Sequence, residues 1–166
     1  MTRPDYIRAV FDFQLECALE TIDRLAASVG DAVDVVFVSG TDFGSQHGLF
    51  ISTDAYRSLF KPYHTEVNRR IHEKTNWKTF IHTCGSVWDL LPDLVEAGFD
   101  VLNPVQCSAA KMDPRDLKRE FGEDLSTTAD WHSRDGRRGG EHVELDGLVV
   151  RRAPFVARAP RRGVEP

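Results

Sequence analysis

The sequence predicts an α/β fold in which a parallel sheet forms about half of a (β/α)8 barrel. Helical and extended segments alternate through the first 130 residues, and strands separated by single helices pair in parallel through right-handed crossovers. No Gly-x-Gly-x-x-Gly or Walker-type loop follows a predicted strand, which disfavours a nucleotide-binding doubly wound sheet. A whole barrel takes about 250 residues. The four strands expected in this chain of 166 residues therefore account for about half of one.

The first helix is predicted over residues 4–29, where apolar side chains recur every three or four positions. Pro4 suits the first helical turn, and Gly30 is a natural stop. The β-branched run at 33–38 then predicts a buried strand, and a polar loop with several glycines follows over 41–48.

A second helical pattern covers residues 53–75, and Pro62 inside it should kink or split the helix. A short strand is expected at 79–81, a helix at 86–97 and a further strand at 100–102.

The last helix and strand have clear boundaries in the sequence. Asp113 and Pro114 suit the N-cap and first position of a helix that ends at Phe121, directly before Gly122. The fourth strand is expected at 125–128.

Composition and charge exclude several classes of protein. Hydrophobic residues make up 41% of the chain and charged residues 28%, which are globular values. The apolar runs are far shorter than the roughly 20 residues that span a bilayer, and the N-terminus has no apolar signal segment. With a net charge of −5 and three scattered cysteines, we expect a cytoplasmic, reduced protein that binds neither a membrane nor nucleic acid.

The composition changes near residue 130. Residues 1–130 hold 13 Lys and Arg against 21 Asp and Glu, whereas residues 131–166 hold eight Arg, no Lys and five acidic residues. The second segment is rich in Gly, Pro and Ala and has no helical period. We therefore expect a partial barrel over 1–130 and a tail over 131–166 that is disordered or foreign to the fold. A basic arm for an acidic surface is the alternative for the tail.

Reactive side chains follow the predicted strands, where a parallel barrel places its active site. His82 and Cys84 lie two residues apart, so on an extended chain their imidazole and thiolate could converge on one zinc ion. The alternative is a hydrogen-bonded imidazole beside a small buried thiol. Cys107 could be a third ligand, although an ordinary half-buried cysteine is the favoured interpretation.

Other polar residues at the strand ends have two interpretations each. Asp42 could act as a general base or bind a substrate donor, or it could cap its own loop. Asn103 and Gln106 could orient a carboxylate or amide substrate, but Asn103 with Pro104 could equally form a turn. His64 falls on the second helix, where we expect it to be exposed.

Three groups of motifs carry a resemblance to a known family. They are GLFISTDAY at 48–56 with FKP at 60–62; FIHTCGS at 80–86 with LPDL at 91–94 and EAG at 96–98; and DVLNPVQ at 100–106 with MDP at 112–114 and LK at 117–118. Together they resemble the uroporphyrinogen decarboxylase superfamily, over roughly residues 5–130. The resemblance implies a (β/α)8 barrel of which this chain is the C-terminal half.

The resemblance implies one of two activities. The superfamily contains decarboxylases, which remove acetate carboxyls from a tetrapyrrole without a metal, and corrinoid-dependent methyltransferases, which use zinc to activate a thiol. The pair His82 and Cys84 matches the zinc motif of the methyltransferase branch. We therefore expect methyl transfer from a corrinoid or a corrinoid protein to a zinc-activated thiol. The alternatives are uroporphyrinogen-type decarboxylation and an inactive half-barrel that self-associates through its open sheet edges.

Overall fold

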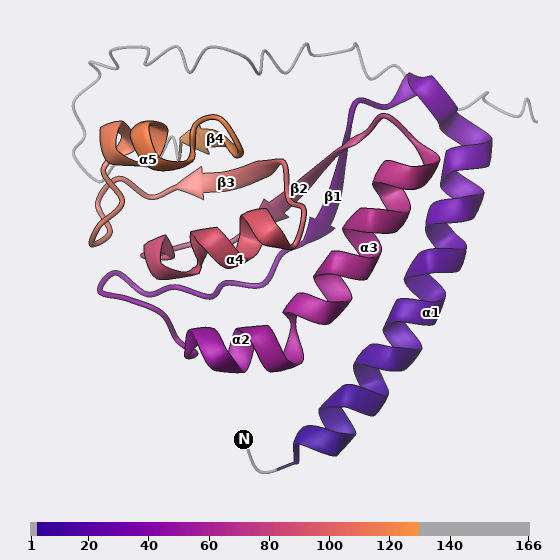
Figure 1. The fold of residues 1–166 in the computed structure, drawn as a ribbon, viewed down its shortest axis with the longest axis horizontal. Helices are drawn as coiled ribbons and strands as arrows, with labels where there is room; N and C mark the ends of the chain where they lie inside the picture. Colours follow the sequence, from indigo (N-terminus) through magenta and orange to yellow (C-terminus); the bar gives the residue numbers. More distant parts are fainter. Residues whose placement is uncertain (1–2, 130–166) are drawn as a thin grey trace, which may run out of the picture.

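The computed structural model describes residues 3–129, which form one parallel sheet of four strands with helices packed against it (Figure 1). The strand order is β1-β2-β3-β4, and each neighbouring pair is parallel. The strands are β1 (Val35–Ser39), β2 (Lys78–His82), β3 (Val101–Val105) and β4 (Ser126–Ala129). Spatial order follows chain order, as it does in a (β/α) barrel, so the predicted α/β class is confirmed. The predicted tail over 131–166 lies outside the described residues.

Five α-helices accompany the strands of residues 3–129, the first before β1 and the other four between strands. They are α1 (Pro4–Val29), α2 (Thr53–Leu59), α3 (Lys61–Lys74), α4 (Leu91–Glu96) and α5 (Pro114–Phe121), with short 3-10 turns at Gly30–Ala32 and Trp88–Leu90. None of the helices within residues 3–129 is long and apolar enough to cross a membrane.

Two prolines set helix boundaries that apolar periodicity alone does not give. The pattern predicted over 53–75 is split at Phe60, so that Pro62 lies in the first turn of α3, where its missing N–H leaves no bond unmade. The helix predicted over 86–97 begins later, with α4. Pro92 would lie in the interior of the longer helix, whereas it lies in the first turn of α4.

The third strand is longer than the sequence suggested. It runs from Val101 to Val105 and includes Asn103 and Pro104, so the interpretation of this pair as a turn is wrong. Its register with β2 places Asn103 opposite His82. The length of β3 therefore brings the polar side chain of Asn103 beside the carboxyl end of β2.

The core of the described residues has two parts. The larger part lies under α2, α4 and α5 and includes Phe43, Tyr56, Leu94 and Leu102. The smaller part joins α1 and α3 to the sheet and consists of Ile22, Ile71 and Trp77, with Val36 and Val38 of β1 packed against them. The helices α1 and α3 therefore cover the face of β1 on which Val36 and Val38 lie (Figure 1).

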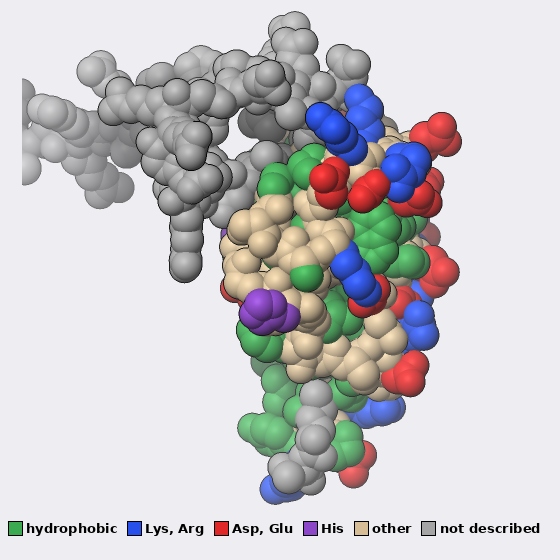
Figure 2. Space-filling model, turned by 90° about the vertical axis from the view of Figure 1, so that its left-hand side faces the viewer, with side chains coloured by type: hydrophobic (Ala, Val, Ile, Leu, Met, Phe, Trp, Pro, Cys, Tyr) green, Lys and Arg blue, Asp and Glu red, His purple; other side chains and the backbone are tan. Residues whose placement is uncertain are grey.

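The surface of the described residues carries charges of both signs. Acidic and basic side chains are interspersed over the face that Figure 2 shows.

His64 is an exception to the expected exposure of polar helical residues. Its ring packs 5.1 Å from that of Phe99 and 5.7 Å from that of Tyr56, measured between centroids, so the prediction that it is exposed is wrong.

Candidate metal site

Three of the predicted site residues lie together at the carboxyl ends of β1 and β2. Asp42 follows β1, His82 is the last residue of β2, and Cys84 follows two residues later. Each offers one ligand atom, and the three atoms all lie within 4.8 Å of one another. The Sγ of Cys84 is 3.5 Å from Nε2 of His82, and that nitrogen is 3.8 Å from Oδ1 of Asp42. We call these three residues the ligand triad.

Hydrogen bonds between the loop after β1 and the loop after β2 hold Asp42 in place. Its Oδ1 accepts a hydrogen bond of 2.9 Å from the backbone N–H of Cys84. One residue on, the backbone N–H of Phe43 donates to Oγ1 of Thr83, also over 2.9 Å. Asp42 does not cap its own loop, as one interpretation had it, but connects the loop after β1 to the loop after β2.

The two loops approach so closely that glycine is required on both sides. Gly44 donates its N–H to the carbonyl of Cys84 over 3.1 Å, and Ser86 donates to the carbonyl of Ser45 over 2.7 Å. Gly85 has a φ of +89°, and a Cβ there would overlap the backbone of Gly44. Sequence reasoning did not assign these glycines a role in the site, although Gly85 directly follows the predicted ligand Cys84.

Asn103 orients the imidazole of His82. The Oδ1 of Asn103 lies 2.8 Å from Nδ1 of His82, so Nδ1 carries the proton and donates it to the amide oxygen. The lone pair of Nε2 then faces Cys84 and Asp42. Metal-binding histidines in proteins have this kind of partner on their second nitrogen. We expected Asn103 to bind substrate. In the structure it instead holds the side chain of His82, one of the three candidate metal-binding residues.

The donor set fits zinc. Imidazole nitrogen, thiolate sulfur and carboxylate oxygen are its three ordinary protein ligands, and a catalytic zinc takes three of them while a fourth position stays open. The side chains of His82 and Asp42 are 38% and 51% exposed, so a substrate can reach this fourth position from solvent. The ligand triad therefore brings together three donors of the kind that bind zinc, and two of its side chains are partly open to solvent.

Two further predicted residues, besides Asn103, lie outside the ligand triad. Gln106 follows β3, and its backbone carbonyl accepts a hydrogen bond of 2.9 Å from the N–H of Ala109 in a turn. Cys107 is exposed, and its Sγ lies 3.6 Å from the carbonyl oxygen of Val105. Among residues 3–129, Asp42 and not Cys107 completes the group of three ligand atoms.

Comparison with known proteins identifies the family of the chain. A family model described as uroporphyrinogen decarboxylase (URO-D) matches residues 1–127. The chain belongs to the URO-D family. URO-D is a TIM-barrel family, and the parallel sheet described above has the strand order of part of such a barrel. Comparisons with curated proteins and with solved structures gave no match.

Proposed function

We propose that this URO-D family protein transfers a methyl group from a corrinoid to a thiol that a bound zinc ion activates. The observation that supports the proposal is the ligand triad, in which Asp42, His82 and Cys84 bring three zinc-type donors together at the carboxyl end of a parallel sheet. A decarboxylase that removes carboxyl groups from a tetrapyrrole without a metal would have no use for these three zinc-type donors.

Each residue of the ligand triad would bind the metal through a different kind of atom. His82 would bind it through Nε2, because Nδ1 is engaged with Asn103. Cys84 would bind it as a thiolate, and Asp42 through its carboxylate while it also holds the backbone N–H of Cys84. Zinc bound here would stabilise a thiol substrate as the thiolate, which is the nucleophilic form.

Methyl transfer then needs the substrate thiol and the corrinoid on the open side of the site. The substrate thiol would lose its proton to solvent on binding the zinc, and its sulfur would form a bond to the methyl carbon as the cobalt–carbon bond of the corrinoid breaks, with the electron pair of that bond left on cobalt. The partial exposure of the Asp42 and His82 side chains supports this placement, since the described residues leave these ligand atoms open to solvent on one side. The chain's own contribution is to fix the ligand positions through Asn103 and through the close contact of the two loops.

Metal analysis of the purified protein tests the proposal. We expect about one zinc per chain in the wild type and a clear loss in His82→Ala, Cys84→Ala and Asp42→Ala. Cys107→Ala is the matched control, because it removes a cysteine outside the ligand triad and should leave the zinc content unchanged. Replacement of zinc by Co²⁺ adds a second measurement, since a thiolate-to-cobalt absorption band should appear in the control and disappear in Cys84→Ala.

A folded protein that binds neither zinc nor Co²⁺ would overturn the proposal. Loss of acetate carboxyl groups from a uroporphyrinogen-type substrate without added metal would then support the decarboxylase alternative. Methyl transfer to a thiol that requires zinc and is lost in Cys84→Ala, but not in Cys107→Ala, is the result we expect.

A further inference from the structure

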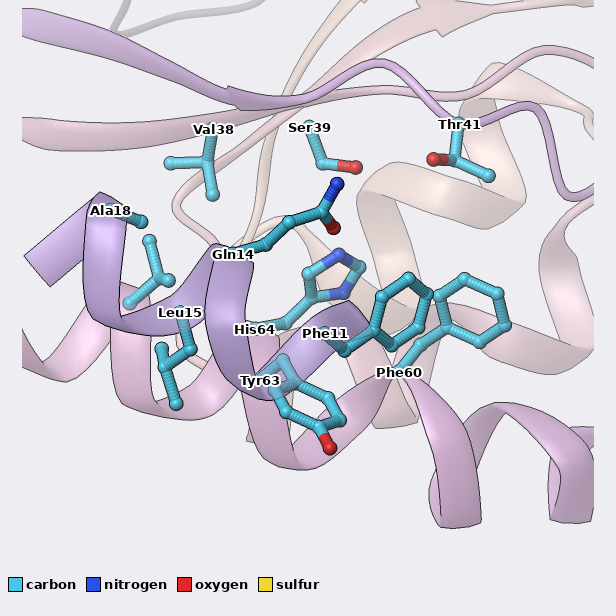
Figure 3. A pocket seen from close by; sticks show the side chains of 11 residues that line it. Phe11, Gln14, Leu15, Ala18, Val38, Ser39, Thr41, Phe60, Tyr63 and His64 are labelled. Atoms are coloured by element: carbon cyan, nitrogen blue, oxygen red, sulfur yellow. The ribbon is translucent and has the colours of Figure 1, made fainter. Parts of the chain in front are cut away.

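A second cavity lies away from the ligand triad, between α1, α3 and the end of β1 (Figure 3). Its volume is about 240 Å³, and none of its lining residues belongs to the triad. Phe11 and Phe60 form one wall, with ring centroids 5.3 Å apart and planes inclined at 59°. Leu15, Ala18, Val38 and Val67 add aliphatic surface, so more than half of the lining side chains are apolar.

Four polar side chains from three elements converge on this apolar cavity. Gln14 comes from α1, Ser39 and Thr41 from the end of β1, and His64 from α3. Figure 3 shows the amide of Gln14 directed toward Ser39, with the imidazole of His64 directly beneath it. Enclosed apolar surface with a few convergent polar groups is typical of small-molecule sites. Among residues 3–129, no Lys, Arg, Asp or Glu lines the cavity, so its chemistry favours an uncharged ligand.

The proton on His64 can be assigned from its neighbour Tyr56. The hydroxyl of Tyr56 lies 2.9 Å from Nδ1 of His64, and Tyr56 is fully buried. Burial and the charge of Asp93 raise the pKa of Tyr56, so its hydroxyl keeps its proton. Nδ1 of His64 is the one hydrogen-bond partner that residues 3–129 give this buried hydroxyl, and an unpaired buried donor is costly, so we assign the Tyr56 proton to the bond with Nδ1. Burial also lowers the pKa of His64 to about 4, so the ring is neutral at pH 7. Its one proton is therefore on Nε2.

Nε2 of His64 consequently offers an N–H donor to the cavity. The ring nitrogen opposite the Tyr56 bond is the one that Figure 3 shows pointing toward Gln14 and Ser39. Since an apolar cavity of about 150 Å³ can hold benzene, the larger cavity here has room for two fused rings. We propose that this cavity binds a neutral, flat aromatic molecule of one or two rings whose hydrogen-bond acceptor receives the Nε2 proton of His64.

Two probe molecules of similar size test both parts of the proposal. Coumarin has two fused rings and a carbonyl acceptor, whereas naphthalene has the rings alone. We expect both to bind wild-type protein in the micromolar to millimolar range, with NMR shift changes at residues that line the cavity. Ala18→Leu, which fills the cavity from α1, should weaken both at least tenfold. Ala27→Leu makes the same change on an exposed part of α1 and should weaken neither.

His64→Phe separates the hydrogen bond from the apolar contacts. We expect this variant to bind naphthalene as the wild type does but coumarin about tenfold more weakly, as loss of one hydrogen bond predicts. Naphthalene binding shows that the cavity of the variant is intact. The proposal is overturned if neither probe binds the wild type, if Ala18→Leu leaves their binding unchanged, or if the ratio of the two affinities is the same in His64→Phe. Zinc content is measured separately, so failure here leaves the methyl-transfer proposal untouched.

Discussion

Asn103 and His82 are joined by a hydrogen bond of 2.8 Å between neighbouring strands whose register places the two residues opposite each other. This bond presents Nε2 of His82 to the ligand triad. We predict that Asn103→Ala lowers zinc affinity by about 10- to 100-fold, the usual effect of losing such a partner. Asn103→Asp should largely restore it, because a carboxylate oxygen can accept the same proton. Competition with a chelator at pH 7 measures both, and equal affinity of Asn103→Ala and the wild type would contradict the assigned role.

The close approach of the two loops predicts a large effect at Gly85. Gly85→Ala places a side chain at a φ of +89° and against the backbone of Gly44, so we expect unfolding free energy to fall by about 2–4 kcal/mol, together with loss of zinc. Gly48→Ala, in the loop after β1, is the control, because a Cβ there meets nothing within 4 Å. Urea unfolding of both variants measures the difference. A Gly85→Ala protein as stable as Gly48→Ala would show that the loops separate at little cost.

Much of the fold could be predicted because its signals are local. Alternating helical and β-branched patterns gave the order of elements, and Gly30 and Asp113 marked helix ends close to those observed. The later start of α4 was missed because apolar periodicity continues through Pro92, while the first-turn preference of proline decides the boundary. Local patterns thus define which elements exist more reliably than where they begin.

Only the part of the site that depends on the spacing of neighbouring residues in the sequence could be predicted. His82 and Cys84 were placed together by the two-residue period of an extended chain, and their Nε2 and Sγ lie 3.5 Å apart. The roles of Asn103 and Asp42 depend on strand register and on a contact between loops, neither of which one sequence reveals. The burial of His64 was missed for a similar reason, since the aromatic residues that enclose it come from other elements.

Asp93 carries a buried charge that should stabilise the protein. Its side chain is 3% exposed, and its Oδ1 lies 2.9 Å from Nε of Arg57 and 2.8 Å from Nζ of Lys61. We predict that Asp93→Asn lowers the unfolding free energy by about 2 kcal/mol at pH 7, because both bonds lose their charged acceptor. Asp89→Asn removes a charge from an exposed pair with Lys111 and should change stability by less than about 0.5 kcal/mol. Thermal or urea unfolding of the two variants compares them.

The same carboxylate predicts a pH dependence of stability. Burial raises the pKa of Asp93, but the hydrogen bonds from Arg57 and Lys61 outweigh it, so the pKa lies below its ordinary value of 3.8. A pKa that is depressed on folding gives stability that is present above the unfolded value and is lost as pH falls through the folded value. We therefore expect unfolding free energy to fall below about pH 4, and to fall less steeply in Asp93→Asn than in the wild type. Parallel curves for the two proteins would contradict this assignment.

We predict that the protein self-associates through the edge of the sheet, and substitution of Phe37 tests this. Within residues 3–129, β1 has a neighbouring strand on one side only. Phe37 of β1 is 60% exposed, and its ring lies 5.7 Å from that of Phe80 between centroids, so an open edge adjoins an apolar face. We expect wild-type protein to associate in a concentration-dependent way and Phe37→Thr to associate less, since threonine keeps the β-propensity but removes the apolar surface. Phe50→Thr, which changes an equally exposed phenylalanine outside the strands, should behave as the wild type does. Light scattering over a range of concentrations measures this, and association that is equal in all three proteins would place the contact elsewhere on the molecule.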